Sequence, residues 1–340
     1  MTLERRRLLA LVGAAATVGL AGCSDGGGDE SGEDEDGEDA IDASESDGGD
    51  DAQHLELPAY SRWLTTDDDG ELVYGYLDWA SLEAVDGAVD EPFTEAELES
   101  DPMLGYPFVG ALAVSTALGQ GLGSFGLAGL FQESGAESGS RVDELLFVGQ
   151  TSVVTGEFDV EEIDDVLTEA SSASPSYDVT TAVAGYDVYT SAMDERSAIA
   201  VGPDALVFAV EADDPVEEIR PTLEAASGDG DRATDADDVA WLVATGGDGQ
   251  FALGVYGAPE DLEDEEAVED EADELTWDEL DDAEGLVASL IVDGSDGFEG
   301  WFAAIVEEPD EAALEELLGT TADDGSVVVD GDRVSAAATW

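Results

Sequence analysis

The sequence predicts an α+β fold in which antiparallel sheets carry helices on one face. Short runs rich in β-branched and aromatic residues recur along the chain, and turns of Asp, Gly and Pro separate them. Helical patterns are few, and three of them begin at an Asp, a residue that caps free amide groups. Many strands with tight turns and few helices are typical of a covered antiparallel sheet.

The first part of the fold is predicted between residues 54 and 227. Strand patterns cover residues 72–79 and 145–158. Asp159 is predicted to cap the helix that follows, with Glu162 completing a capping box. Asp214-Pro215 is predicted to begin a second helix. Further strands are expected at residues 179–183, 185–190, 197–201 and 205–210.

The second part is predicted between residues 228 and 340 and repeats the same order in a shorter form. Strands are expected at 250–256 and 297–306, and Asp310 is predicted to begin the matching helix. Two final strands are expected at 326–329 and 333–339.

The repeated order predicts an internal duplication. Trp63-Leu64 recurs as Trp241-Leu242, and Phe93 aligns with Leu275. Further along, Phe147, Gly149, Glu157, Asp159 and Leu167 align with Phe298, Gly300, Glu308, Asp310 and Leu318 at a smaller offset. Phe93 and Leu275 are 182 positions apart, whereas Phe147 and Phe298 are 151 apart. The difference, 182 − 151 = 31, is the length of the uncharged segment 102–132, so the first copy is interpreted as the second with an insertion. Chance similarity in a biased composition is the alternative.

The uncharged segment, residues 102–132, allows two interpretations. The whole segment is long enough to span a bilayer and holds many small residues, as in a membrane-inserted or re-entrant hairpin. Within it, an apolar run from Tyr106 to Leu118 has the pattern of a helix. The segment also fits a buried helix followed by a glycine-rich loop. The dense glycines after Leu118 oppose a stable lone spanning helix, which favours the buried helix.

The charge of the chain indicates that the protein works in concentrated salt. The 340 residues carry 9 basic and 86 acidic side chains, a net charge of −77, and no Lys, yet 43% are hydrophobic, so most of the chain is expected to fold. In molar salt the Debye length falls to about 3 Å, which screens neighbouring carboxylates from one another. The composition resembles that of haloarchaeal proteins. Nucleic-acid binding is disfavoured because it needs basic patches, so we expect no nucleic-acid partner.

The segment 1–22 is predicted to be an export signal. Arg5, Arg6, Leu8 and Leu9 follow the twin-arginine pattern, and an uncharged run too short to span a bilayer comes next. Leu20, Ala21, Gly22 and Cys23 fit a lipobox, in which the Cys23 thiol is acylated and becomes the new N-terminus.

Residues 23–53 are predicted to be a disordered acidic tether. After Cys23 they are almost all Gly, Ser, Asp and Glu, a composition that cannot bury a core. Thirty residues of this kind reach roughly 30 Å, and like charges extend them further. Cys23 is also the only cysteine, so no disulfide is expected.

These motifs resemble those of a group of haloarchaeal lipoproteins with a twin-arginine signal, a lipobox and an acidic tether. The resemblance is specific as far as the tether and compositional beyond it. It implies a protein anchored through acylated Cys23 on the extracellular face of the cell membrane, with membrane lipid as its partner. Members of this group share a cellular location rather than an activity, so the resemblance implies no catalytic residue.

Few residues invite a chemical interpretation. His54 is the only histidine and lies where the predicted tether meets the domain, so we expect no zinc site, no Ser-His-Asp triad, and no other metal, cofactor or catalytic set. Gly121, Gly123 and Gly126 match a dinucleotide fingerprint by letter, without its strand and helix context. Acidic turns such as 67–70 and 293–296 do not fit a calcium loop. We expect the tryptophans in the core and the arginines paired with carboxylates.

The sequence therefore predicts a surface protein that acts as a non-catalytic binding or interaction module, for an envelope protein or a small molecule. The alternative is an extracellular hydrolase that works with two carboxylates, for example on a polysaccharide.

Overall fold

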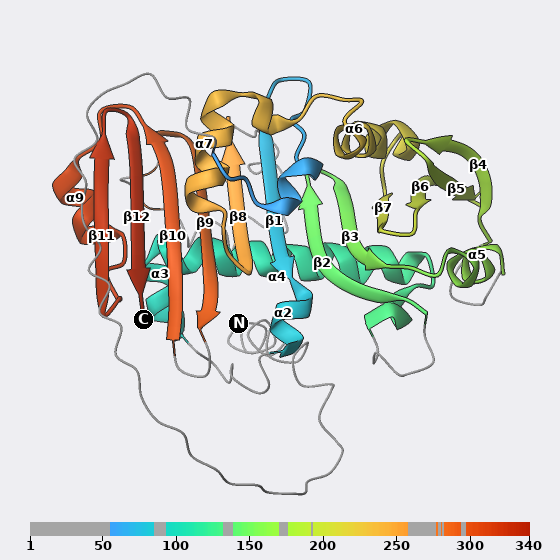
Figure 1. Cartoon of the computed structure of the whole chain (residues 1–340), viewed down its shortest axis with the longest axis horizontal. Helices are drawn as coiled ribbons and strands as arrows, with labels where there is room; N and C mark the ends of the chain where they lie inside the picture. The colour runs from blue at the N-terminus through green and yellow to red at the C-terminus, as the bar shows by residue number, and fades with distance from the viewer. Residues whose placement is uncertain are drawn as a thin grey trace, which may run out of the picture.

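A computed structural model of the chain describes residues 55–84, 93–131, 139–169, 176–191, 193–257, 277, 280, 282–293 and 297–340. They form one twelve-stranded antiparallel sheet with the order β11-β12-β10-β9-β8-β1-β2-β3-β7-β6-β5-β4 (Figure 1). The predicted α+β class with antiparallel pairing is confirmed.

The first seven strands are β1 (Leu72–Asp78), β2 (Arg141–Val148), β3 (Thr151–Glu157), β4 (Asp178–Val183), β5 (Tyr186–Ser191), β6 (Asp194–Val201) and β7 (Ala205–Ala209). The other five are β8 (Phe251–Tyr256), β9 (Ala283–Asp293), β10 (Gly297–Val306), β11 (Asp324–Asp330) and β12 (Arg333–Thr339).

The α-helices are α2 (Trp79–Ala84), α3 (Glu95–Ser100), α4 (Pro102–Ser124), α5 (Val160–Thr168), α6 (Pro215–Ser227), α7 (Asp237–Gly246) and α9 (Glu311–Leu317). The 3-10 helices are η1 (Ala59–Trp63), η2 (Ala128–Phe131) and η3 (Ala233–Asp235).

The middle of the sheet is the antiparallel pair β1 and β8, with Tyr74 opposite Gly254. On one side the sheet continues through β2 and β3, and on the other through β9 and β10, each time by antiparallel neighbours. Figure 1 shows the two halves side by side, with α5 near one end and α9 near the other.

The residues that suggested a duplication fall into two kinds. Asp159 and Asp310 occupy the same position, because each caps the helix after the third strand of its half. Phe147 and Phe298 do not correspond, since Phe147 lies near the end of β2 and Phe298 at the start of β10. Leu275, which aligns with Phe93, lies outside the described residues. The duplication therefore stays a prediction.

Helices cover both faces of the sheet, whereas the sequence predicted cover on one face. On the face toward the viewer in Figure 1, η1, α6 and α7 pack on side chains such as Tyr74 and Val287. On the opposite face, α4 and α5 pack on Leu145 and Leu206. The second layer exists because the uncharged segment supplies a whole helix with enough apolar surface to cover the strands behind it.

Helix α4 crosses the back of the sheet from the C-terminal half to the N-terminal half and contacts β8, β1, β9 and β2. Glycine allows close packing of α4 at three places, against β8, α3 and β7. A Cβ on Gly110 would lie 2.8 Å from the Ala252 carbonyl oxygen, and one on Gly105 would lie 2.8 Å from that of Leu98. A Cβ on Gly121 would collide with the ring of Phe208. The interpretation as a buried helix therefore fits the structure.

Three local predictions were wrong. The single strand predicted at 145–158 is instead the end of β2 and the whole of β3, which turn at Gly149 and pair with each other. The helix in the uncharged segment does not give way to a loop after Leu118 but continues to Ser124, since Gly121 and Leu122 are buried against the sheet. The capping box at Asp159 does not form, because the Ser140 hydroxyl accepts from the Asp159 amide and the Glu162 carboxylate accepts from the Gly139 amide. Asp159 still caps the helix with its own carboxylate.

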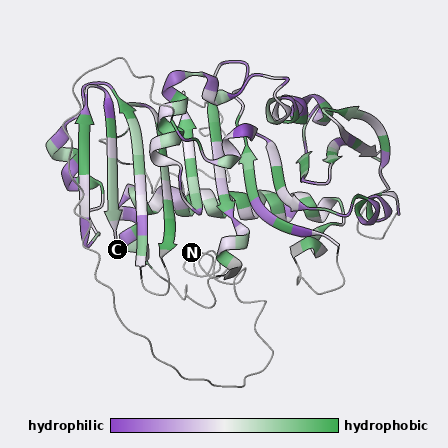
Figure 2. Ribbon diagram, viewed as in Figure 1, coloured by the Kyte–Doolittle hydropathy of each residue, from purple (hydrophilic) through white to green (hydrophobic). Residues whose placement is uncertain are grey.

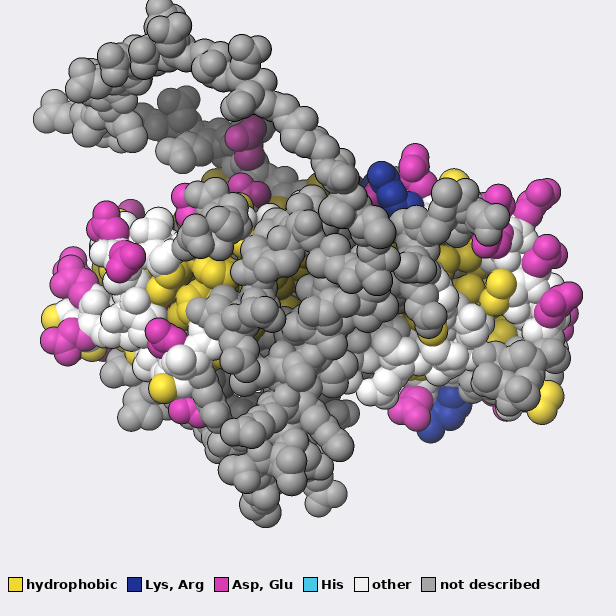
Figure 3. Space-filling model, turned by 90° about the horizontal axis from the view of Figure 1, so that it is seen from below, with side chains coloured by type: hydrophobic (Ala, Val, Ile, Leu, Met, Phe, Trp, Pro, Cys, Tyr) yellow, Lys and Arg dark blue, Asp and Glu magenta, His cyan; other side chains and the backbone are white. Residues whose placement is uncertain are grey.

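Hydropathy follows this architecture. In Figure 2 the central strands and α4 are mostly green to white, while purple gathers at the turns and on the outer helices. Seen from below, Asp and Glu side chains are spread over both ends of the molecule, with Arg in a few places (Figure 3).

Candidate functional site

The residues of the predicted export signal and lipobox, together with His54, lie outside the described residues. These residues are Arg5, Arg6, Leu8, Leu9, Leu20, Ala21, Gly22 and Cys23. The anchor is therefore argued from its motif alone. The described domain begins at Leu55, directly after the predicted tether.

The fingerprint-like glycines lie at the wrong end of a helix for a nucleotide. Gly121 and Gly123 are in the last turn of α4, and Gly126 follows with φ +77°. A phosphate needs the free amide groups of a helix N-terminus, whereas the end of a helix presents carbonyl groups. Gly121 is explained by its contact with Phe208.

The acidic turn 67–70 is organised by its own backbone. The Asp67 carboxylate accepts from the amides of Asp69 and Glu71, at 3.0 and 2.8 Å, and Gly70 takes φ +86°. Across the described residues, no three side chains of His, Cys, Asp or Glu lie where they could hold a metal ion.

The main buried polar cluster of the described residues lies in the middle of the front face and consists of tyrosines. The rings of Tyr60 and Tyr76 stack at 4.2 Å between centroids. The Tyr60 hydroxyl donates to the Gly247 carbonyl oxygen at 2.8 Å and lies 3.3 Å from the hydroxyl of Tyr74. Burial raises the pKa of all three phenols, so they remain neutral hydrogen-bonding groups.

Beside this cluster, two carboxylates face each other across β1 and β2, where Asp78 is the register partner of Glu144. Glu144 accepts from the Tyr76 hydroxyl at 3.1 Å and from the Thr155 hydroxyl at 2.9 Å. Asp78 accepts from both the amide and the hydroxyl of Ser81, in the first turn of α2. Each carboxylate is thus already used to hold local structure, which gives the hydrolase alternative no support here.

A third carboxylate, Asp101, is fully buried. It accepts from the amides of Met103, Gly319 and Thr321 and from the Thr321 hydroxyl, at 3.0 to 3.3 Å. Burial raises the pKa of Asp101, and these four donors oppose that shift. The arrangement caps α4 and ties it to the turn before β11, which is a structural role.

The described arginines confirm the expected pairing at four positions. Arg62 pairs with Asp204, and Arg333 pairs with Asp238. Arg141 pairs with Asp143 and Glu157, and Arg220 pairs with Glu217 and Glu224. Arg232 donates instead to the Ala225 carbonyl oxygen.

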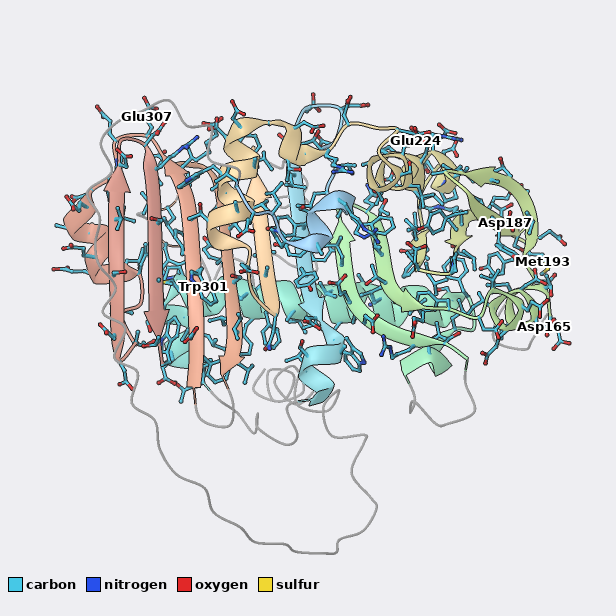
Figure 4. The ribbon with its side chains drawn as sticks, in the orientation of Figure 1. Asp165, Asp187, Met193, Glu224, Trp301 and Glu307 are labelled. Atoms are coloured by element: carbon cyan, nitrogen blue, oxygen red, sulfur yellow. The ribbon has the colours of Figure 1, made fainter. Side chains whose placement is uncertain are left out.

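The tryptophans differ in burial. Trp63 and Trp277 are buried, as expected for core residues. The ring of Trp241 lies under the Arg333 guanidinium, and the Trp340 indole donates to Thr321. Trp301 departs from the expectation, because it is partly exposed on β10, on a part of the sheet with no helix of the described residues in front of it (Figures 1 and 4).

This uncovered area, which we call the Trp301 face, is the front of the three strands β10, β12 and β11. It consists of Glu299 and Trp301 on β10, Ser335, Ala337 and Thr339 on β12, and Asp324, Ser326 and Val328 on β11. Helix α7 reaches β9 and β10 above it, and α9 packs on the opposite side of β11. Val328 is 57% exposed.

The sequence analysis expected Trp301 in the core with the other tryptophans and missed this face. A usable signal was present, since Glu299 and Trp301 alternate along the strand predicted at 297–306 and therefore share one face of the sheet. Which face the helices leave open depends on the tertiary packing.

The comparisons with known proteins add little. No protein-family model matches the chain, and no curated protein matches it. Among solved structures, crystal forms III and I of a protein named TP0453 align with 84% of this chain and with 94% and 93% of theirs. Their TM-scores are 0.43 and 0.42 and their identities 10% and 11%, values too low to carry an argument about function.

One described helix, α4, is long and apolar enough to cross a membrane by length and composition alone. Half of its most apolar stretch is buried inside the protein. A core helix of this length passes the same test, and its contacts with the sheet account for its composition.

Proposed function

We propose that this chain is a lipid-anchored, halophilic protein of the extracellular membrane face, and that its domain is a non-catalytic binding module. The anchor is inferred from the twin-arginine and lipobox motifs that end at Cys23. The observation that carries the binding role is the Trp301 face, where an aromatic side chain and several hydroxyl groups stand on a sheet surface that no described helix covers.

A rigid sheet is a suitable support for such a surface. Side chains on strands are held by the hydrogen-bonded ladder, so they need less ordering on binding than side chains on loops. β10 is paired along its length with β9 and β12, and its other face is buried in the C-terminal core.

The anchor is tested by Cys23→Ser in the full chain, with Ser24→Ala as the matched control. We expect Cys23→Ser to move the protein from the membrane fraction to the medium, and Ser24→Ala to leave it on the membrane. Mass spectrometry of the mature N-terminus should show a lipid-modified cysteine. An unmodified Cys23 in membrane-bound protein would contradict the proposal.

The export route is tested separately. Replacing both Arg5 and Arg6 by Lys should leave the uncleaved precursor inside the cell, because the pair is the recognised feature. The control Arg7→Lys makes the same substitution at the next arginine, outside the recognised pair, and should be exported normally. Equal export of the two variants would point to another route.

A further inference from the structure

We propose that Met193 is a site of modification, at which a peroxide oxidises the side chain to methionine sulfoxide while the domain stays folded. The inference goes beyond the proposed function, because it depends neither on the lipid anchor nor on a bound ligand. Three features carry it: the exposure of Met193, its place in the fold and its contrast with the buried Met103.

Met193 is far more exposed than any other large apolar side chain of the described residues. It is 87% exposed, whereas Val328 and Val179, the next in order, are 57% and 50% exposed. Its thioether therefore lies in the solvent, where a dissolved oxidant meets it without any opening of the fold. In Figure 4 Met193 is at the outer end of the N-terminal half, the end that also carries Asp187 and Asp165.

The fold does not need an apolar side chain at position 193. Met193 lies in the turn between β5 and β6, and it belongs to none of the three core clusters of the described residues. Its backbone amide donates to the hydroxyl of Ser191 at 3.2 Å, and Ser191 is buried. The turn is thus held through the backbone of Met193 and not through its side chain, so packing does not explain a methionine here.

Met103 provides a comparison within the same molecule. The chain has three methionines, and Met1 belongs to the predicted export signal. Met103 is 0% exposed in the first turn of α4, in a core cluster with Phe302 and Val334. An oxidant reaches its sulfur only when the structure around it opens. The folded domain thus has one accessible methionine thioether and one protected one.

The reaction is a two-electron oxidation that needs only the peroxide. A lone pair of the Met193 sulfur attacks one peroxide oxygen, so that an S–O bond forms and the O–O bond breaks. The other oxygen leaves as hydroxide and takes the proton of the transferred oxygen, which releases water. The sulfur is oxidised by two electrons and the peroxide is reduced by two. The new polar group at Met193 faces solvent, whereas a sulfoxide at Met103 would place a polar group in the core.

The test uses the full chain in detergent and molar salt, treated with hydrogen peroxide over a time course. Trypsin separates the two methionines, because it cleaves after Arg141 and Arg196 and so places Met103 and Met193 in different peptides. Mass spectrometry of these peptides gives the oxidation rate of each sulfur. We expect Met193 to gain one oxygen atom at least about tenfold faster than Met103, with an unchanged circular dichroism spectrum. In denaturant the two rates should become equal, because only the fold protects Met103.

Met193→Leu and Met103→Leu form a matched pair of variants. Both substitutions remove the sulfur and keep an apolar side chain of similar size. Met193→Leu should abolish the fast uptake of oxygen, and Met103→Leu should leave it unchanged. If Met103→Leu does not fold, the two peptides of the wild-type chain still give the comparison. Methionine sulfoxide reductases A and B should remove the oxygen from the oxidised wild-type chain, which identifies the product as a sulfoxide.

Three outcomes would overturn the inference. Equal oxidation rates of Met193 and Met103 in the folded chain would show that exposure does not control the reaction. Fast uptake of oxygen by Met193→Leu would place the modification on another side chain. Protection of Met193 in peroxide-treated cells, where the purified chain reacts, would mean that a partner covers this side chain. None of these results bears on the anchor at Cys23, which membrane fractionation measures separately.

Discussion

Asp101 connects parts of the chain that are far apart in sequence. Its carboxylate caps the first turn of α4 through Met103 and also holds Gly319 and Thr321 near the C-terminal end of the chain. Trp340 donates to the same Thr321 hydroxyl, so the C-terminal residue joins this contact. One buried carboxylate thus fixes α4 relative to the C-terminal strands.

Removing this carboxylate should be costly. We expect Asp101→Ala to lower the free energy of unfolding by about 3 kcal/mol, because it leaves buried donors without an acceptor. Asp159→Ala is the matched control, since Asp159 caps α5 at the exposed surface with two similar bonds and should cost about 1 kcal/mol. Denaturant unfolding in molar salt measures the free energy of unfolding of both variants. Equal losses of stability would show that Asp101 acts only as a helix cap.

The glycines of α4 should respond to substitution in opposite directions. Gly121→Ala should destabilise the fold by about 1–3 kcal/mol, since its Cβ would collide with the buried ring of Phe208. Gly119→Ala and Gly123→Ala meet nothing within 4 Å and should stabilise the helix by about 0.5–1 kcal/mol. Thermal unfolding of the three variants measures these changes in stability. A stabilising Gly121→Ala would disprove the close contact between Gly121 and Phe208.

At the scale of elements, α4 is distinguished by its lack of charge. Within 23 residues it has no acidic or basic side chain, in a chain where 28% of residues are charged. Its inner side is buried against the sheet through Val114, Leu118 and Leu122. Its outer side carries small and polar residues such as Ser115, Thr116 and Gln120.

A charge placed on either side of α4 should reveal its environment. Val114→Asp should prevent folding, because Val114 is fully buried. Thr116 is exposed, so Thr116→Asp should not change folding. Added to Cys23→Ser, it should not change the release of the protein from the membrane. If α4 were held in lipid, Thr116→Asp would instead be destabilising, which membrane fractionation and melting curves in molar salt would detect.

The strands were the part of the fold that could be predicted from the sequence. The strand predicted at 297–306 has the bounds of β10, and that at 250–256 begins one position before β8, because alternating apolar residues and Gly turns mark strand ends well. β9 was missed, since Leu286–Val292 is a nearly continuous apolar run in which periodicity does not separate a strand from a buried helix. Helix α7 was also missed.

The candidate site was far less predictable. The alternation that puts Glu299 and Trp301 on one face is visible in the sequence, but their exposure depends on α7 ending at Gly246 and on α9 packing behind β11. Those are tertiary contacts between segments far apart in the chain. The same holds for Asp101, whose partners Gly319 and Thr321 follow no local pattern.

At the scale of the whole molecule, charge sets the conditions for folding. With a net charge of −77, the compact state is opposed by self-repulsion that molar salt screens. We expect the domain to unfold when salt is diluted from molar to about 0.1 M, as measured by circular dichroism. Replacing the salt by sucrose at equal osmolality should not preserve the fold, since sucrose does not screen charge. An unchanged spectrum after dilution would contradict this account.

The position of β1 has a mechanical consequence. The described domain begins at Leu55 and soon reaches β1, which has five strands on one side and six on the other. A pulling force transmitted from the N-terminal side therefore enters the sheet at its centre. Drawing β1 out must rupture two ladders, to β2 and to β8, whereas an outermost strand such as β11 can peel away from one neighbour. For a domain anchored through Cys23 as proposed, a pulling force would thus act on the strand that is hydrogen-bonded on both sides.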